Sequence, residues 1–224
     1  MRIAVTGASS AIGASLVESL IERGDDVVAF QRRPASGSSR VTQHLGDVRD
    51  ERAVDAALTG CDVVVHLAAK VGVVGPRDEY ASTNINGTRN VIAAARRSGA
   101  RGVVHVSSPS VAHVGEAIIG GGADAAVADH GSAWYPETKA LAERLAIDAS
   151  DGRCAVVAIR PHLVWGPGDT QLVGRIVERA AQGRLALVGG GRALVDTTYV
   201  DNAASALAAA VDAIGPGATC AGRA

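Results

Sequence analysis

A tyrosine and a lysine four residues apart are the first candidates for chemistry in this sequence. Tyr135 and Lys139 lie at positions i and i+4, a spacing that puts two side chains on one face of a helix. A free tyrosine phenol has a pKa of about 10, and a nearby ammonium group favours its phenolate. Tyr135 could then give a proton to a reacting oxygen or take one from it. The pair therefore predicts an acid–base centre on a helix.

The helix that carries this pair must begin close to Tyr135, because Pro136 is tolerated only in the first turn of a helix. Ser132 is a residue type that caps helices, so we expect the helix to start beside it. Ser108 supplies a third polar group. It directly follows Gly102–Ser107, an apolar run that predicts a buried strand. Its hydroxyl could bond and polarise the oxygen of a substrate.

A glycine-containing turn joins the first predicted strand, Arg2–Thr6, to a predicted helix over Ile12–Arg23. Such a turn binds the pyrophosphate of a dinucleotide, because backbone N–H groups and the helix dipole face the phosphates. Gly7 allows the tight turn, and Gly13 lets the helix pack closely on the strand. The middle glycine of the usual three is missing. The predicted contacts are Gly7, Ser9, Ser10, Ala11, Ile12 and Gly13.

The end of the second predicted strand, Val27–Gln31, indicates which dinucleotide is bound. An acidic residue there would bond the ribose 2′-hydroxyl group of NAD, but the sequence continues with Arg32 and Arg33. Two guanidinium groups can hold a phosphate, so NADP is expected in preference to NAD. The alternative is that both arginines belong to a solvated loop.

The loop that follows offers a contact for the adenine ring. Asp47, beside Val48, could accept a hydrogen bond from the adenine amino group. Asp50 is expected to cap the short helix Glu51–Leu58 instead.

Short apolar runs alternate with longer helical patterns along the rest of the chain. The further strands expected are Asp62–Leu67, Cys154–Arg160 and Leu185–Val188, and the further helices are Thr83–Arg97, Trp134–Ala149, Leu172–Gln182 and Asn202–Val211. Apolar strands between helices predict an α/β doubly wound parallel sheet, a Rossmann fold that binds its ligand at the carboxyl ends of the strands. Residues 1–165 would form the dinucleotide-binding domain, and residues 166–224 a partial substrate lobe interleaved with its last elements.

Composition narrows the class of protein. The 224 residues carry a formal net charge of −1 and only 3% aromatic residues, which is unlike a nucleic-acid binder. No segment has the length of a membrane span and the N-terminus has no signal-peptide layout, so a cytoplasmic protein without membrane partners is expected. Its three cysteines are interpreted as reduced thiols. His113, His130 and His162 are too scattered for a metal-ligand pattern, so no metal is expected.

The ordered set of motifs resembles the extended branch of the short-chain dehydrogenase/reductase family, the NAD-dependent epimerase/dehydratase group. The resemblance runs from Arg2 to about Ala208. It is carried by the Thr6–Gly13 turn, Asp47–Val48, His66–Ala69, Asn84–Thr88, Val106–Ser108, Tyr135–Lys139, Arg160–Asp169 and Tyr199–Asn202.

This resemblance implies roles that spacing alone does not assign. It implies that Ser108, Tyr135 and Lys139 form a catalytic triad. It also implies that Asn84 supports the cofactor near the third strand. The remaining cofactor contacts expected are Leu67, Ala68, Ala69, Ser107, Tyr135, Lys139, Pro161, His162 and Leu163.

Within the family, the stretch Val195–Asn202 resembles the 3β-hydroxysteroid dehydrogenase-like members. Val195 stands where sugar-nucleotide epimerases usually carry an arginine that binds the substrate diphosphate. The favoured function is therefore hydride transfer between NAD(P) and a secondary alcohol or ketone of an apolar, steroid-like substrate. Arg192 could still bind phosphate, which keeps an NAD-dependent sugar-nucleotide epimerase or dehydratase as the alternative. A non-catalytic dinucleotide-sensing protein is the second alternative.

Three features bear on the substrate and on assembly. The long loop His113–Ala133 is expected to be either a substrate flap over Tyr135 or a disordered excursion. The chain ends earlier than its relatives usually do, so the substrate lobe is either minimal or truncated. A homodimer is possible through the two long helices, where Val91 and Ile92 could face a partner; the alternative is that they face the sheet.

Overall fold

A computed structural model describes residues 1–34, 40–72, 74–113, 118–120, 122–123, 126–127, 133–169 and 173–224. The helix cap expected at Ser132, His130, the first residue of the helix predicted from Leu172, and most of the loop predicted as a flap lie outside the described residues.

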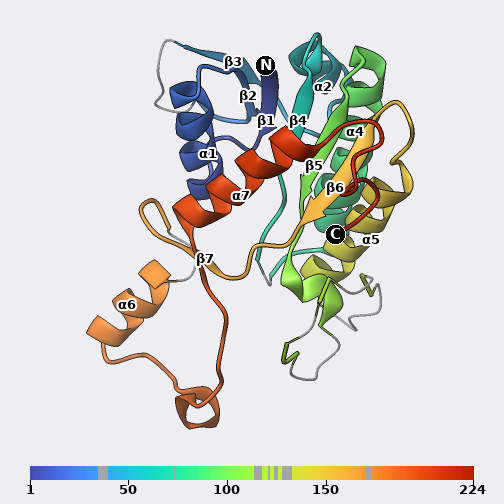
Figure 1. The fold of residues 1–224 in the computed structure, drawn as a ribbon. Coiled ribbons are helices and arrows are strands. Elements are labelled where there is room, and N and C mark those ends of the chain that lie inside the picture. Colours follow the sequence, from blue (N-terminus) through green and yellow to red (C-terminus); the bar gives the residue numbers. More distant parts are fainter. Residues whose placement is uncertain are drawn as a thin grey trace.

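Six parallel strands form the central sheet in the order β3-β2-β1-β4-β5-β6 (Figure 1). Their bounds are β1 Arg2–Thr6, β2 Asp26–Gln31, β3 Val41–Leu45, β4 Val63–His66, β5 Gly102–Val106 and β6 Ala155–Ile159. The chain starts in the middle of the sheet, extends it to one edge through β2 and β3, and returns to build the other half. This confirms the doubly wound α/β fold, whose strand order reverses beside β1.

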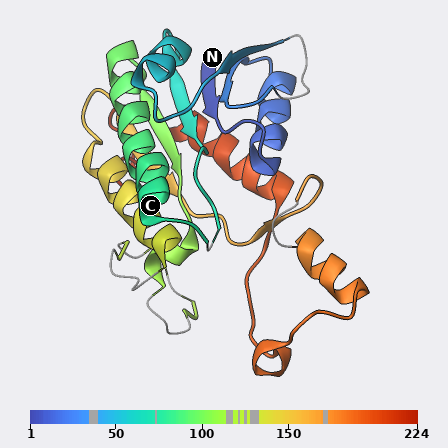
Figure 2. The same ribbon diagram turned by 180° about the vertical axis from the view of Figure 1, so that it is seen from behind.

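Helices cover both faces of the sheet (Figures 1 and 2). Helices α1 (Ala11–Glu22) and α7 (Val200–Ala213) pack on one face, and α2 (Glu51–Leu58), α4 (Gly87–Ser98) and α5 (Trp134–Asp148) pack on the other. Successive strand residues alternate between these layers, so the strands must be apolar on both sides.

The segment between β4 and α4 differs from the single helix expected over Thr83–Arg97. It consists of a short helix α3 (Arg77–Tyr80), a π-helical turn (Ala81–Asn86) and then α4. Within α4, Val91 and Ile92 are buried in the core beneath the sheet. They face the sheet rather than a partner, so the expectation that they could serve a dimer contact is wrong.

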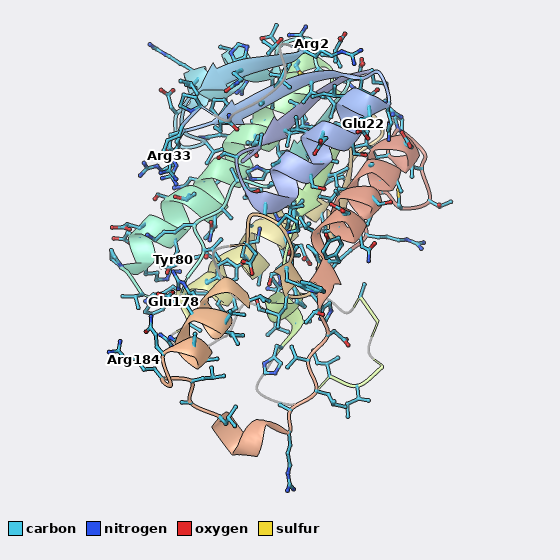
Figure 3. The ribbon with its side chains drawn as sticks, turned by 90° about the vertical axis from the view of Figure 1, so that its left-hand side faces the viewer. Arg2, Glu22, Arg33, Tyr80, Glu178 and Arg184 are labelled. Atoms are coloured by element: carbon cyan, nitrogen blue, oxygen red, sulfur yellow. The ribbon has the colours of Figure 1, made fainter. Side chains whose placement is uncertain are left out.

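A smaller unit lies beyond the sheet. Two-residue strands β7 (Val164–Trp165) and β8 (Thr198–Tyr199) pair with each other, and the chain between them carries helix α6 (Val173–Ala181) and a 3₁₀ turn (Val188–Gly191). No residue of α6 is buried. Glu178 and Arg184 lie on this segment, which extends away from the sheet (Figure 3).

One predicted strand is absent from the structure, and one observed strand was not predicted. Leu185–Val188 is not a strand, because residues 184–187 have no regular structure and lie on the exposed segment without a partner strand. Strand β3 was not expected at all, since its sequence Val-Thr-Gln-His-Leu is only half apolar. It can be polar because it lies at the edge of the sheet, with Thr42 and Gln43 exposed.

The opposite edge of the sheet is covered by the last residues of the chain. The N–H of Gly222 donates to the carbonyl of Val156, and the N–H of Ala158 donates to the carbonyl of Arg223, at 2.7 and 2.9 Å. Val157 and Arg223 thereby form a parallel bridge. The outer side of β6 is paired with residues far away in the sequence.

Candidate active site

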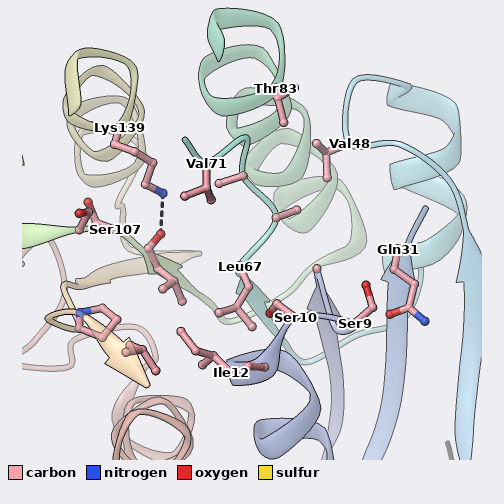
Figure 4. Close-up of a pocket in the computed structure, with 18 of the residues that line it drawn as sticks. Ser9, Ser10, Ile12, Gln31, Val48, Leu67, Val71, Thr83, Ser107 and Lys139 are labelled. Carbon is pink, nitrogen blue, oxygen red and sulfur yellow. Dashed lines mark hydrogen bonds between the residues drawn. The ribbon is translucent and has the colours of Figure 1, made fainter. Parts of the chain in front are cut away.

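A cavity of about 750 Å³ lies at the carboxyl ends of β1, β2, β4 and β5, where a doubly wound sheet binds its ligand (Figure 4). Most of the residues expected at the site line it. They are Gly7, Ser9, Ser10, Ala11, Ile12, Arg32, Arg33, Asp47, Val48, Leu67, Ala68, Ala69, Ser107, Ser108, Tyr135, Lys139, Pro161 and Leu163. Gly13, Asn84 and His162 do not line it. The fold therefore brings both the glycine turn and the Ser-Tyr-Lys set to one cavity.

The two glycines of the turn are required by close packing. Gly7 has φ +71°, and a Cβ atom there would lie 2.8 Å from the backbone nitrogen of Ala68. A Cβ atom on Gly13 would lie 2.6 Å from the carbonyl oxygen of Gly7. Gly13 thus lets α1 pack closely against the turn, as expected. Gly13 itself does not line the cavity. The turn fits a pyrophosphate at Gly7, where no side chain separates the backbone from the cavity, and Ser9, Ser10 and Ala11 line the cavity beside it.

Ser10 explains how α1 begins without the middle glycine. It is the N-cap residue of α1, and its hydroxyl oxygen accepts a hydrogen bond from the N–H of Gly13 at 3.1 Å. A serine that caps the helix satisfies one of the N–H groups left free in its first turn. The other free N–H groups of this turn remain available to an anion.

The end of β2 carries the residues expected near the ribose. Arg32 and Arg33 line the cavity, and Gln31 before them is buried with its Oε1 atom unpartnered. A neighbouring cavity of about 510 Å³ is lined by Arg32 together with Arg49 and Lys70. Cationic side chains therefore gather beside the end of β2, where Arg49 is paired with Asp47 and Lys70 with Glu79.

Asp47 is held by Arg49. Nε and Nη2 of Arg49 donate to the two carboxylate oxygens of Asp47 at 2.9 and 2.7 Å, and the backbone N–H of Arg49 donates as well. These bonds lower the pKa of the Asp47 carboxyl group. Asp50 caps α2 as expected, accepting from the N–H groups of Arg52 and Ala53.

Tyr135 and Lys139 project from the first turns of α5 into the cavity. The Lys139 ammonium group is buried and donates to the carbonyl oxygen of Val106 at 2.6 Å (Figure 4). Burial lowers the pKa of Lys139 to about 8, although the nearby Glu143 carboxylate acts in the opposite direction. Burial also raises the pKa of Tyr135, and a hydrogen bond with Ser108 only partly offsets this.

The raised pKa of Tyr135 differs from the expectation that Lys139 would favour the phenolate. The physical reason is that desolvation penalises the charged phenolate more than its hydrogen bond with Ser108 favours it. A phenol that keeps its proton at neutral pH is suited to donate that proton to a carbonyl oxygen.

Ser108 lies between Tyr135 and a second serine that the sequence did not single out. Its hydroxyl lies 2.8 Å from the hydroxyl of Ser110 and accepts from the backbone N–H of Ser110 at 3.3 Å. Ser110 also lines the cavity. The turn Pro109–Ala112 after β5 brings Ser110 to the cavity. Pro109, directly after Ser108, was the sequence feature that could have indicated this turn.

Asn84 and His162 are two of the expected cofactor contacts that do not line the cavity. Asn84 is buried, accepts from the N–H of Lys70 at 2.7 Å, and donates to Thr138 Oγ1 at 3.0 Å. It can support the cofactor loop but does not reach the cavity. His162, also expected as a cofactor contact, is exposed and outside the cavity lining.

A buried ion pair lies one helical turn beyond Lys139. Nε of Arg160 donates to Oε2 of Glu143 at 2.8 Å, and Nη2 of Arg160 donates to Oε1. The Glu143 side chain is 1% exposed and that of Arg160 10%. Because Arg160 directly precedes Pro161, the pair ties α5 to the segment that borders the cavity.

Among the described residues, no group of three His, Cys, Asp or Glu side chains could hold a metal ion. No helix in the described part of the chain is long and apolar enough to cross a membrane.

The fold and the cavity together are those of the extended short-chain dehydrogenase/reductase class, whose members are nicotinamide-dinucleotide-dependent oxidoreductases. Comparison with known proteins identifies the group within that class. A sequence profile of the 3-beta hydroxysteroid dehydrogenase/isomerase family matches residues 4–219, so the chain belongs to this family.

Individual relatives agree with this assignment. The 2-alkyl-3-oxoalkanoate reductase of Stenotrophomonas maltophilia (strain K279a) is 47% identical, over all of this chain and 69% of that protein. The 3-beta-hydroxysteroid dehydrogenase of Mycolicibacterium neoaurum is 31% identical, over all of this chain and 64% of that protein. The solved structure of MoeE5 in complex with UDP-glucuronic acid and NAD is 31% identical, with a TM-score of 0.76, over 93% of this chain and 71% of that one. The chain thus spans only part of the length of these relatives.

Proposed function

We propose that this chain transfers hydride between a nicotinamide dinucleotide and the ketone or secondary alcohol of an apolar substrate. The observation that carries the proposal is the single cavity that Gly7, Ser108, Tyr135 and Lys139 share. Tyr135 is the acid–base residue, Ser108 binds the reacting oxygen, and Lys139 holds the cofactor ribose. The glycine turn and the start of α1 bind the pyrophosphate.

The proposed reduction needs one hydride and one proton, and these residues together with one bound cofactor supply both. When bound, the reduced nicotinamide supplies a hydride to the carbonyl carbon. Ser108 donates a hydrogen bond to the carbonyl oxygen, and the Tyr135 phenol gives that oxygen its proton. The products are the secondary alcohol, the oxidised cofactor and a Tyr135 phenolate, to which a proton then returns from solvent.

Some of the side chains that line the cavity are apolar and suit an apolar substrate. Leu163 and Trp165 line the cavity and are 41% and 39% exposed. These surfaces suit hydrocarbon rather than a charged diphosphate. The relative with 47% identity is named as a reductase of 2-alkyl-3-oxoalkanoates. We therefore propose a 3-oxo compound with alkyl chains as the substrate class, and steroid ketones as the nearest alternative.

The proposed activity is tested by following NADPH oxidation with three sets of compounds. These are 2-alkyl-3-oxoalkanoates of increasing chain length, 3-ketosteroids and UDP-sugars. We expect turnover of the oxoalkanoates, with KM falling as the alkyl chains lengthen. Conversion of a UDP-sugar without net oxidation of NADPH would instead establish the epimerase alternative. The similarity to MoeE5, solved with UDP-glucuronic acid and NAD, is the reason to include this alternative in the test. Cofactor binding without turnover of any compound would favour a sensor.

The proposed preference for NADP rests on Arg32 and Arg33. Each hydrogen bond to a charged group contributes about 1.5–3 kcal/mol, so removing both guanidinium groups should lower the affinity for NADPH relative to NADH by about a hundred-fold. We expect this loss in Arg32→Ala/Arg33→Ala, measured by cofactor fluorescence titration. Arg184→Ala, on the exposed segment far from the cavity, is the control. A wild-type chain that binds NADH more tightly than NADPH would contradict the preference.

A further inference from the structure

A continuous chain of buried polar side chains runs between the sheet and α5 on the side of the sheet that carries α4. The Thr6 hydroxyl lies 2.7 Å from Nδ1 of His66, and Nε2 of His66 lies 3.0 Å from the hydroxyl of Thr88. The Thr88 hydroxyl in turn donates to the carbonyl oxygen of Asn84 at 2.6 Å. All of these side chains are 2% exposed or less.

The network of hydrogen bonds continues from Asn84 to α5, the helix that carries Tyr135. Asn84 Nδ2 donates to the Thr138 hydroxyl, which donates to the carbonyl oxygens of Trp134 and Tyr135 at 2.7 and 3.2 Å. The π-helical turn Ala81–Asn86 places Asn84 where it reaches both this helix and the backbone of Lys70. A single amide thereby connects the loop after β4 with the first turn of α5.

Among the described residues, the first turn of α5 is held from outside by the Arg77 guanidinium group, which donates to the Glu137 carboxylate, and by the hydroxyl of Thr138. Its N-cap residue, Ala133, makes no side-chain capping bond, and Pro136 has no N–H group. The Thr138 hydroxyl therefore fixes the carbonyl groups of the two residues that precede the proline. Since Tyr135 must meet a reacting oxygen within a fraction of an ångström, the orientation of this turn decides how often the phenol is aligned.

His66 joins the two halves of this network as a neutral imidazole. Burial lowers its pKa to about 3, and the Lys139 ammonium acts in the same direction. A neutral imidazole can donate from one ring nitrogen and accept at the other, which matches its two threonine neighbours. The network therefore keeps the same hydrogen bonds throughout the neutral pH range.

We propose that Thr138 is a positioning residue for Tyr135, held by the buried polar chain through Asn84, Thr88, His66 and Thr6. This inference rests on the proposed function, because it assumes that the Tyr135 phenol transfers the proton. Thr138 touches neither the cavity nor the reacting atoms. Its hydroxyl acts through the backbone of the turn on which Tyr135 lies.

The test removes the Thr138 hydroxyl without changing the shape of the side chain. We expect Thr138→Val to lower kcat about ten-fold, because small misplacements of a reacting group are costly, while KM for the cofactor changes by less than about two-fold. Thr138→Ser keeps the hydroxyl and should restore kcat. Thr59→Val is the matched control, since the Thr59 hydroxyl donates to the carbonyl of Asp55 in the same i→i−4 manner, far from the cavity.

Two results separate this inference from the proposed function. If Tyr135→Phe abolishes turnover but Thr138→Val turns over like the wild type, the positioning role is wrong and the proposed function stands. If Thr138→Val only lowers the melting temperature, or Thr138→Ser fails to rescue kcat, the role of Thr138 is structural. If Tyr135→Phe turns over normally, the proposed function is wrong, and the inference falls with it.

Discussion

Tyr135→Phe should lower the rate of ketone reduction about a thousand-fold, while the affinity for the cofactor stays within a few-fold of the wild type. General acid catalysis contributes about 10²–10⁴ in rate, and we propose this phenol as the proton donor of the reaction. Because burial raises the pKa of Tyr135, the wild-type reduction should persist through neutral pH and fall only at alkaline pH, where the phenol loses its proton. Oxidation of the alcohol needs the phenolate and should rise with pH instead.

The measurement is the pH dependence of kcat/KM in both directions, together with cofactor titration of each variant. Tyr199→Phe is the matched control, since Tyr199 packs edge-on against Trp165 but does not line the cavity. Its rate should match the wild type. Reduction that persists undiminished in Tyr135→Phe would remove Tyr135 from the mechanism.

Arg160→Met should lower the free energy of unfolding by about 3–5 kcal/mol, the usual cost of leaving one partner of a buried ion pair uncompensated. The Glu143 carboxylate would keep its 1% exposure and lose both bonds from the guanidinium group. The nearest positive charge left to it is Lys139, one turn earlier on α5. Urea unfolding at neutral pH measures the loss, and the pH dependence of kcat reports any effect on Lys139.

Two variants test whether the loss comes from the unpaired carboxylate. Glu143→Gln/Arg160→Met removes both charges and should recover most of the stability, because a buried pair contributes little net free energy over a neutral replacement. Arg97→Met breaks an exposed ion pair with Asp55 and Glu51 and should change stability far less, since solvent screens such pairs. Equal losses in Arg97→Met and Arg160→Met would contradict the assignment.

The fold could be predicted from the sequence wherever strands are buried on both faces. The apolar runs that became β1, β2, β4, β5 and β6 need helices on each side, and this requirement defines the doubly wound sheet. Edge and surface elements could not be predicted in the same way. Strand β3 has an exposed face and a mixed sequence, and the apolar residues 185–187 remain exposed rather than forming a strand.

Residues whose role follows from local backbone geometry were predicted well. Gly7 and Gly13 occupy the close contacts expected of them, and Asp50 caps α2. Ser108, Tyr135 and Lys139 meet at the cavity because the carboxyl end of β5 and the first turns of α5 are adjacent.

Features that depend on tertiary neighbours were missed. Desolvation of Tyr135 reverses the expected direction of its pKa, and no local sequence pattern reports how deeply a phenol is buried. Asn84 reaches Thr138 only because a π-helical turn replaces the expected regular helix. The position of Glu143 near the site could be predicted, since it lies four residues after Lys139 on the same helix face. No local sequence pattern indicates that Arg160 is its partner.

The pairing of Gly222 and Arg223 with β6 has a consequence for how the chain behaves before it has folded completely. Strand β6, Ala155–Ile159, is wholly apolar, and in the described part of the chain its outer side pairs only through the bridge with Arg223. Unpaired edges of this kind template aggregation, whereas polar edges such as β3 discourage it. On a ribosome, β6 emerges more than sixty residues before Gly222 and Arg223, so its outer side stays open to other chains during that interval. The sheet is therefore exposed to misassembly at the edge farther from β3 until Gly222 and Arg223 have been made.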